Sequence, residues 1–343
     1  MAAAAAAGVG AGLGATDAFA GAAAARTTAI DDVPADVMAL VLRCLDGASL
    51  AAVGCVCSNL RRLAADPATW RELCLAMWPS LNDIPSSSYY TIAGGVHYRA
   101  LFADAFPFPA TFSTPPPPPA ASSSSSPAGC NHPLLPERLV SAVDLHHGGA
   151  LIMSRIVETD ATSDWFLGSP FRVDALVQEA FSSPTPAIAA ADLSLSWILI
   201  DPSTGRALNA SSRRPVAVDR KWLTGDTVAR FAVVLAGVAL EAAVTCDERR
   251  GHVREVSLCV EDGDGGGVSG RDGLVAVAAA MAGARCGGGR GAEAAARVRY
   301  EEFVAGKKAR KEWKARREGM VDLCCSGVGA AAFVGFLVML TLR

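Results

Sequence analysis

Apolar residues recur at the helical period between residues 33 and 77. Three stripes follow one another, and each has the spacing of one buried helical face. Residues suited to begin and end helices stand between them: Asp32, Pro34, Asp46, Gly47, Ser49, Asp66 and Pro67. The pattern predicts three short helices, the first capped by Asp32 and the second by Ser49. Fewer than fifty residues bury too little apolar surface to be stable alone, so we expect this segment to complete its core on a partner.

This segment resembles the F-box. The resemblance rests on Val33-Pro34, Asp36-Val37, Leu45-Asp46, Leu50, Val56-Cys57, Arg61, Leu63, Asp66-Pro67, Trp70 and Leu73-Cys74. F-box proteins are substrate receptors of SCF-type ubiquitin ligases, so the resemblance implies a Skp-family adaptor and a cullin scaffold as partners. Two positions depart from the family pattern: Val33 replaces the usual Leu, and Leu60 replaces an aromatic residue. Both are apolar, so we expect weaker packing with binding retained.

The resemblance also implies which residues bind the adaptor. The set is Val33, Pro34, Asp36, Val37, Leu40, Val41, Leu45, Leu50, Val53, Val56, Cys57, Leu60 and Trp70. Within it we expect two roles. The docking surface is formed by Pro34, Val37, Leu40 and Leu45. The helices are held together by Leu50, Val53, Val56 and Trp70.

The apolar period changes from helical to two between residues 137 and 260. Leu193, Leu195, Trp197 and Leu199 point one way, with Ser194, Ser196 and Ile198 on the other face, and a turn follows at 201–205. Further strands are expected at 139–145, 151–157, 216–218, 228–235 and 256–260. A helix over 273–282 is expected to close an antiparallel β-rich domain. We expect Trp165, Trp197 and Trp222 to be buried in the core in the first place, and to contact a ligand only in the second.

Several blocks in this region are similar to those of a plant F-box family that joins an F-box to a C-terminal domain and an apolar tail. The blocks are 164–174, 195–202, 211–216, 222–226 and 252–258. The resemblance implies that the β-rich domain binds the protein to be ubiquitinated, whose identity the sequence does not give. The strands and tryptophans are also similar to those of lectin domains, so an alternative function is a lectin-like or peptide-binding membrane protein whose F-box is a non-degradative scaffold.

Two segments are too biased in composition to fold. Residues 1–29 are almost entirely Ala and Gly, without the basic start and bulky apolar core of a secretory signal, and are predicted to be a disordered leader. Residues 107–126 contain proline and serine runs typical of a spacer. The segment before them, 79–104, has mixed polarity, and its Tyr89, Tyr90, Tyr98 and Phe102 are able to pack onto the third helix or the next domain. The predicted order is therefore leader 1–29, F-box 30–78, connecting segment and linker 79–136, β-rich domain 137–282, basic helix 283–319 and apolar tail 320–343. This is an α+β protein.

The segment over residues 323–342 is predicted to span a membrane. Residues 323–342 contain no charged residue, and twenty helical residues span about 30 Å, the thickness of a bilayer core. A dense basic stretch over 307–317 precedes it and should remain in the cytosol. We predict a C-terminal tail anchor on a cytosol-facing membrane, with lipid contacts from Leu323, Phe333, Phe336, Leu337 and Leu340. The alternatives are a buried core helix and, for the basic stretch, a nuclear signal in a nuclear or cytoplasmic protein.

Composition limits the remaining possibilities. The 343 residues carry a net charge of −3, which gives no global attraction to nucleic acid. The ten cysteines include no Cys-x-x-Cys pair, which argues against zinc-finger and thioredoxin-like sites and favours reduced thiols.

No residue pattern predicts a catalytic, cofactor or metal site. His146 and His147 are neighbours that a strand points to opposite faces. Asp262 and Asp264 lack the downstream Glu of a calcium loop. Arg213-Arg214 could bind an anion or a phosphorylated partner, but the pattern favours a solvated face. We therefore predict a subunit that is not itself an enzyme.

Overall fold

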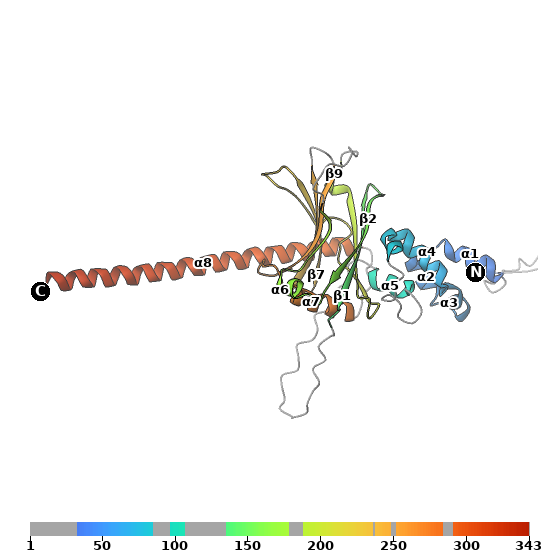
Figure 1. The fold of residues 1–343 in the computed structure, drawn as a ribbon, viewed down its shortest axis with the longest axis horizontal. Helices are drawn as coiled ribbons and strands as arrows, with labels where there is room; N and C mark the ends of the chain where they lie inside the picture. Colours follow the sequence, from blue (N-terminus) through green and yellow to red (C-terminus); the bar gives the residue numbers. More distant parts are fainter. Residues whose placement is uncertain are drawn as a thin grey trace, which may run out of the picture. The chain divides into compact units, whose positions relative to one another are not determined.

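The computed structural model describes residues 33–84, 97–106, 135–177, 188–235, 237–247, 252–283 and 291–342 (Figure 1). The predicted leader and the proline and serine runs of the predicted linker lie outside these residues. Helices come first, two antiparallel sheets follow, and a long apolar helix comes last. The protein has an α+β fold, as predicted. The chain divides into two compact units, residues 1–45 and 46–343.

The first unit contributes helix α1 (Ala35–Arg43). Pro34 is the residue that precedes its first turn, and no side chain caps it among the described residues. Asp36 in the first turn and Arg43 in the last turn have the charges that the helix dipole favours. The predicted cap Asp32 lies outside the described residues.

Three further helices follow, so the predicted second helix is in fact two. Helices α2 (Gly47–Val53) and α3 (Ser58–Ala64) are separated by a turn, and Cys57 in an extended conformation caps α3. The cap of α2 is Asp46, which accepts a hydrogen bond from Ser49 N at 2.7 Å, so the predicted cap Ser49 is wrong. Asp66 caps α4 (Pro67–Met77) as predicted, accepting from Thr69 N at 3.0 Å.

Nine strands of the described residues form two antiparallel sheets. The four-stranded sheet has the order β2-β1-β4-β5, and the five-stranded sheet has the order β3-β9-β8-β7-β6. In the first sheet the strands are β1 (Arg138–His147), β2 (Ala150–Asp160), β4 (Leu193–Ile200) and β5 (Ala207–Asn209). In the second they are β3 (Arg172–Val177), β6 (Ala217–Arg220), β7 (Thr227–Leu235), β8 (Val238–Asp247) and β9 (His252–Asp262).

One hydrophobic core joins the two sheets. Both sheets contribute alternate residues to it, and in β4 these are the predicted Leu193, Leu195, Trp197 and Leu199. Helix α7 (Gly270–Ala282) adds Leu274, Val277 and Met281, which confirms the predicted closing helix. Gly270 is required here because a Cβ at this position would lie 1.9 Å from the carbonyl O of Phe166.

Two of the three tryptophans expected in this core lie on the surface. Trp197 is 0% exposed, whereas Trp165 on helix α6 (Asp164–Gly168) is 77% exposed and Trp222 is 87% exposed. Trp222 stands in the short loop between β6 and β7, where neither sheet can cover it. The prediction of a core role is therefore wrong for Trp165 and Trp222.

A single helix, α8 (Ala292–Thr341), forms the C-terminal part of the described chain. Its first turns pack on β7, where Tyr300 joins a small apolar cluster with Val216 and Ala232. The Tyr300 hydroxyl donates to Glu241 at 2.8 Å, and burial together with this carboxylate raises the pKa of Tyr300 above its usual value. The basic stretch and the apolar stretch that the sequence predicts are therefore parts of one continuous helix.

Candidate partner-binding surfaces

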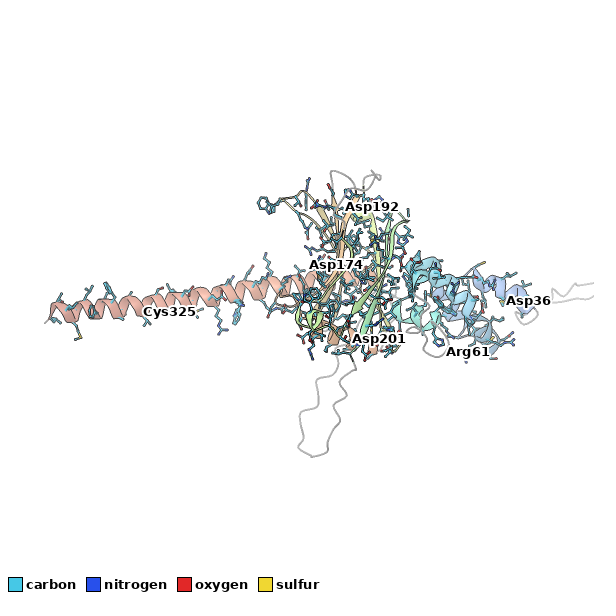
Figure 2. All side chains as sticks on the ribbon, in the orientation of Figure 1. Asp36, Arg61, Asp174, Asp192, Asp201 and Cys325 are labelled. Carbon is cyan, nitrogen blue, oxygen red and sulfur yellow. The ribbon has the colours of Figure 1, made fainter. Side chains whose placement is uncertain are left out.

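Helix α1 exposes an apolar stripe. Val37, Leu40 and Val41 recur at the spacing of one helical face, and all three are exposed, Leu40 to 62%. Leu42 on the other side of the helix is buried. Asp36 lies near the start of the same helix (Figure 2). Large apolar side chains gathered on one exposed face are typical of a surface that a partner covers.

The other residues of the predicted adaptor set fall into three groups. Val33, Pro34, Asp36 and Val56 are exposed, and Leu45, Val53 and Cys57 are half-buried. Leu50, Leu60 and Trp70 are buried, so they support the helices and present little surface. Val56, which we expected to hold the helices together, is 71% exposed because it lies in the turn between α2 and α3. That packing role is wrong for Val56.

An aromatic cluster joins α4 to a further helix, α5 (Tyr98–Ala105). The ring of Phe102 lies 5.3 Å from that of Trp70 and 5.8 Å from that of Trp78. Trp70 Nε1 donates to Ala64 O at 2.7 Å, which ties α4 to the end of α3. Gly47 is also required, because a Cβ there would lie 2.2 Å from Phe102 Cζ. Helices α2 to α5 therefore pack as one body.

A buried carboxylate links this helical body to the four-stranded sheet. Asp144 of β1 accepts hydrogen bonds from Ser80 N at 2.9 Å and from Ser80 Oγ at 2.6 Å, and Ser80 lies in the short helix η2 (Pro79–Asp83). Ser154 Oγ donates to the same carboxylate at 2.8 Å. Burial raises the pKa of Asp144, and these hydrogen bonds offset part of that shift. Asp144 is therefore a joint between η2 and the sheet.

A second link lies at the edge strand β5. Asp104 of α5 accepts from Arg206 Nε at 2.9 Å and from Ala207 N at 3.0 Å. Asn209 Nδ2 donates to Ala105 O at 3.4 Å. Sequence reasoning missed both links because each partner lies more than sixty residues away along the chain. The helices therefore hold the sheet in a fixed relation to α4.

The residues considered as catalytic, metal-binding or anion-binding candidates have structural roles. His147 Nε2 accepts from Ala189 N at 3.2 Å, and Asp262 accepts from Asp264 N and Gly266 N within its own loop. Arg213 has a left-handed φ of 64° and bridges Leu195 of β4, in the segment that leads from β5 of one sheet to β6 of the other. Among the described residues, no group of three or more His, Cys, Asp or Glu side chains could hold a metal ion.

The last part of α8 is an apolar surface that none of the described residues covers. The helix contains a window with mean hydropathy 2.2, long and apolar enough to cross a membrane, and none of that window is buried. The five predicted lipid contacts are all exposed: Leu323, Phe333, Phe336, Leu337 and Leu340. Cys325 lies on this stretch (Figure 2).

The basic stretch of α8 has two parts. Lys307 Nζ donates to Glu261 at 2.6 Å, and Arg310 donates to Gly263 O, so these residues fasten the helix to the domain. The remaining basic side chains up to residue 317 are exposed: Lys308, Lys311, Lys314, Arg316 and Arg317. The exposed charge thus lies between the domain and the apolar window.

Comparison with known proteins points to one family. Residues 30–76 match the F-box-like family model. The chain is 38% identical to probable F-box protein At2g36090 of Arabidopsis thaliana, over 91% of this chain and 92% of that protein. It is 36% identical to F-box protein At2g27310 of the same plant, over 88% of this chain and 93% of the relative. F-box protein At3g44326, also of Arabidopsis thaliana, is 33% identical over 90% of this chain and 89% of its own length.

Proposed function

The chain belongs to the F-box protein family, and we propose from this that it is the substrate receptor of an SCF-type ubiquitin ligase. Residues 30–76 bind a Skp-family adaptor, which connects the receptor to a cullin scaffold. The observation that carries the proposal is the exposed stripe of Val37, Leu40 and Val41 on α1, inside the segment that matches the family. The buried Leu50, Leu60 and Trp70 pack the following helices together, so that these helices can contact the same partner.

A substrate receptor acts by positioning its target and catalyses no reaction itself. A target held beside the ligase meets the ubiquitin donor at a high effective concentration, so that transfer becomes a local event. The links at Ser80–Asp144 and Asp104–Arg206 support this role, because they hold the β-rich domain against the helices that follow α1. The β-rich domain is the part that binds the target.

We also propose that α8 anchors the receptor in a membrane. The uncovered apolar window supports the anchor, and the exposed basic residues upstream support an orientation with the β-rich domain in the cytosol. Leu323 lies thirteen positions after Arg310 on the helix, so the domain would stand about 20 Å from the start of the span.

The adaptor proposal is tested by changing the stripe alone. Val37→Asp with Leu40→Asp places two carboxylates where the adaptor would bury apolar groups, and burying an unpaired charge is strongly unfavourable. We expect immunoprecipitates of the wild type to contain adaptor and cullin, and those of the double variant to lose at least 90% of both. The β-rich domain should remain folded, because the stripe is exposed.

The matched control puts two aspartates on exposed apolar residues of the β-rich domain, as Val177→Asp with Val275→Asp. This variant should recover adaptor and cullin as the wild type does. Equal recovery by the wild type and the α1 variant would show that the stripe does not bind an adaptor.

A further inference from the structure

Strand β6 is an edge of the five-stranded sheet. Within the described residues it pairs with β7 alone, so one side of its backbone has no strand neighbour. The corresponding edge of the other sheet, β5, differs, because Asp104 accepts from Ala207 N there. A strand with a neighbour on one side alone is a template to which an extended chain can add as a further strand.

A groove runs beside this edge. It has a volume of about 490 Å³ and lies between β6 and the first turns of α8. Its apolar lining comes from both elements, with Val216 and Val218 on one side and Ala294 and Val298 on the other. Val218 belongs to β6, and Val216 lies in the bend directly before it. The groove can therefore receive apolar side chains of an added strand.

The charges around the groove favour an acidic occupant. Arg214 and Arg297 line it together with a single carboxylate, Glu293, which pairs with Arg213 at 3.9 Å. Arg297 Nη2 donates to Pro215 O at 3.0 Å, which fixes the guanidinium at the groove wall. No carboxylate of the described residues pairs with Arg214. A carboxylate on the occupant would therefore meet uncompensated positive charge.

Exposed apolar residues extend the surface beyond the groove. Trp222 and Leu223 occupy the loop that directly follows β6, and both are largely exposed. Lys221 begins the same loop. The strand, the groove and the loop thus form one strip along the edge of the sheet, with the apolar Val218, Trp222 and Leu223 beside basic residues, and with Asp219 paired to Arg230 at 2.9 Å. Strips of this kind bind extended peptides through the backbone and select them through side chains.

We propose that the β6 edge and its groove bind an extended peptide segment of the target in which apolar residues alternate with acidic ones. The segment adds as a strand to β6, its apolar side chains enter the groove, and its carboxylates meet Arg214 and Arg297. This inference rests on the proposed receptor function, because it names the class of target segment that the receptor takes.

The test measures peptide binding to the full chain, purified with its adaptor in detergent micelles. Four fluorescein-labelled eight-residue peptides serve as probes: alternating Val and Glu, the same peptide with alternate amides N-methylated, alternating Val and Lys, and alternating Ser and Glu. We expect the Val/Glu peptide to bind at least tenfold more tightly than each of the other three. On binding, the amide of Val218, which points away from β7, should gain protection from hydrogen exchange.

Charge reversal in the groove gives a result that misfolding cannot produce. Arg214→Glu with Arg297→Glu should weaken the Val/Glu peptide at least tenfold and strengthen the Val/Lys peptide. Arg214→Glu alone leaves the Arg297–Pro215 hydrogen bond in place and should weaken the Val/Glu peptide about threefold. The matched control, Arg155→Glu with Arg271→Glu, changes the net charge equally at two exposed positions and should bind as the wild type does.

The inference is overturned if no probe binds, if the acidic and basic peptides bind alike, or if the control variant weakens binding as much as the groove variant. It is also overturned if the edge is occupied by a second copy of the chain, which sedimentation would show as a dimer that the groove variant dissociates. Adaptor recovery in the same preparations separates the two proposals. A wild-type preparation that retains adaptor but binds no peptide contradicts this inference alone, whereas absence of adaptor from the wild-type preparation contradicts the receptor function.

Discussion

Replacing Trp197 by alanine is expected to lower the free energy of unfolding by about 3–5 kcal/mol, because a large core side chain is lost and a cavity remains. Trp197 is fully buried at the centre of β4, and it packs in the core that both sheets and α7 share. A loss of this size is a large fraction of the stability of a typical domain. Urea unfolding of the full chain in detergent, followed by near-ultraviolet circular dichroism, measures the change.

Trp222→Ala is the matched control for this prediction. It removes the same side chain from an exposed loop, where substitutions usually change stability by less than about 0.5 kcal/mol. Trp222→Ala should therefore unfold at nearly the wild-type urea concentration. If both variants lose similar stability, the core does not lie between the two sheets around Trp197.

Charging the apolar window of α8 is expected to release the protein from membranes. Phe333→Arg with Leu337→Arg puts two guanidinium groups near the middle of the span. Each of them makes insertion into the membrane less favourable by about 2.5–3.5 kcal/mol. We expect the wild type to stay in the membrane pellet after alkaline carbonate washing and the double variant to move to the soluble fraction. Deletion of residues 323–343 should have the same effect.

The control variant for the membrane anchor has two arginines placed upstream of the apolar window. Met320→Arg with Val321→Arg adds equal charge at exposed positions that would lie at the headgroups. This variant should resist carbonate as the wild type does. A wild-type protein that carbonate removes completely would show that α8 does not span a membrane, and its apolar stretch would then be covered by protein.

The sequence correctly predicted the elements that depend on interactions between residues close together in the chain. Asp66 and Pro67 begin α4 as expected, and the alternation of β4 places Trp197 and its neighbours in the core. The turn after β4 also forms as predicted, because Asp201 accepts from Ser203 N at 2.9 Å. In each case residues within five positions of one another determine the structure.

The features that sequence reasoning missed depend on distant partners. Strand β8 lies in the middle of the five-stranded sheet, yet its alanines and Glu241 have weak strand propensity. It is a strand because β7 and β9 pair with it on both sides along its whole length. The Ser80–Asp144 joint was missed for the same reason, since sixty-four residues separate its two members.

The candidate surfaces were predicted with mixed success. The exposed stripe on α1 agrees with the predicted docking residues Val37 and Leu40, although adaptor binding by these residues remains a prediction. The exposure of Val56 was not foreseen, because a single apolar period gives no sign of the turn that divides α2 from α3. The β6 groove could not be predicted at all, since its two walls come from segments about eighty residues apart.

The receptor function is tested most directly by comparing the targets of two forms of the protein in cells. The wild type and the Val37→Asp, Leu40→Asp variant are each fused to a proximity-labelling enzyme at the N-terminus, and the ubiquitin load and half-life of each labelled protein are measured. A receptor predicts proteins labelled by both forms that carry less ubiquitin and survive longer when the adaptor is absent. If every protein labelled by both forms has the same ubiquitin load and half-life, the F-box serves another purpose and the chain is not a ligase receptor.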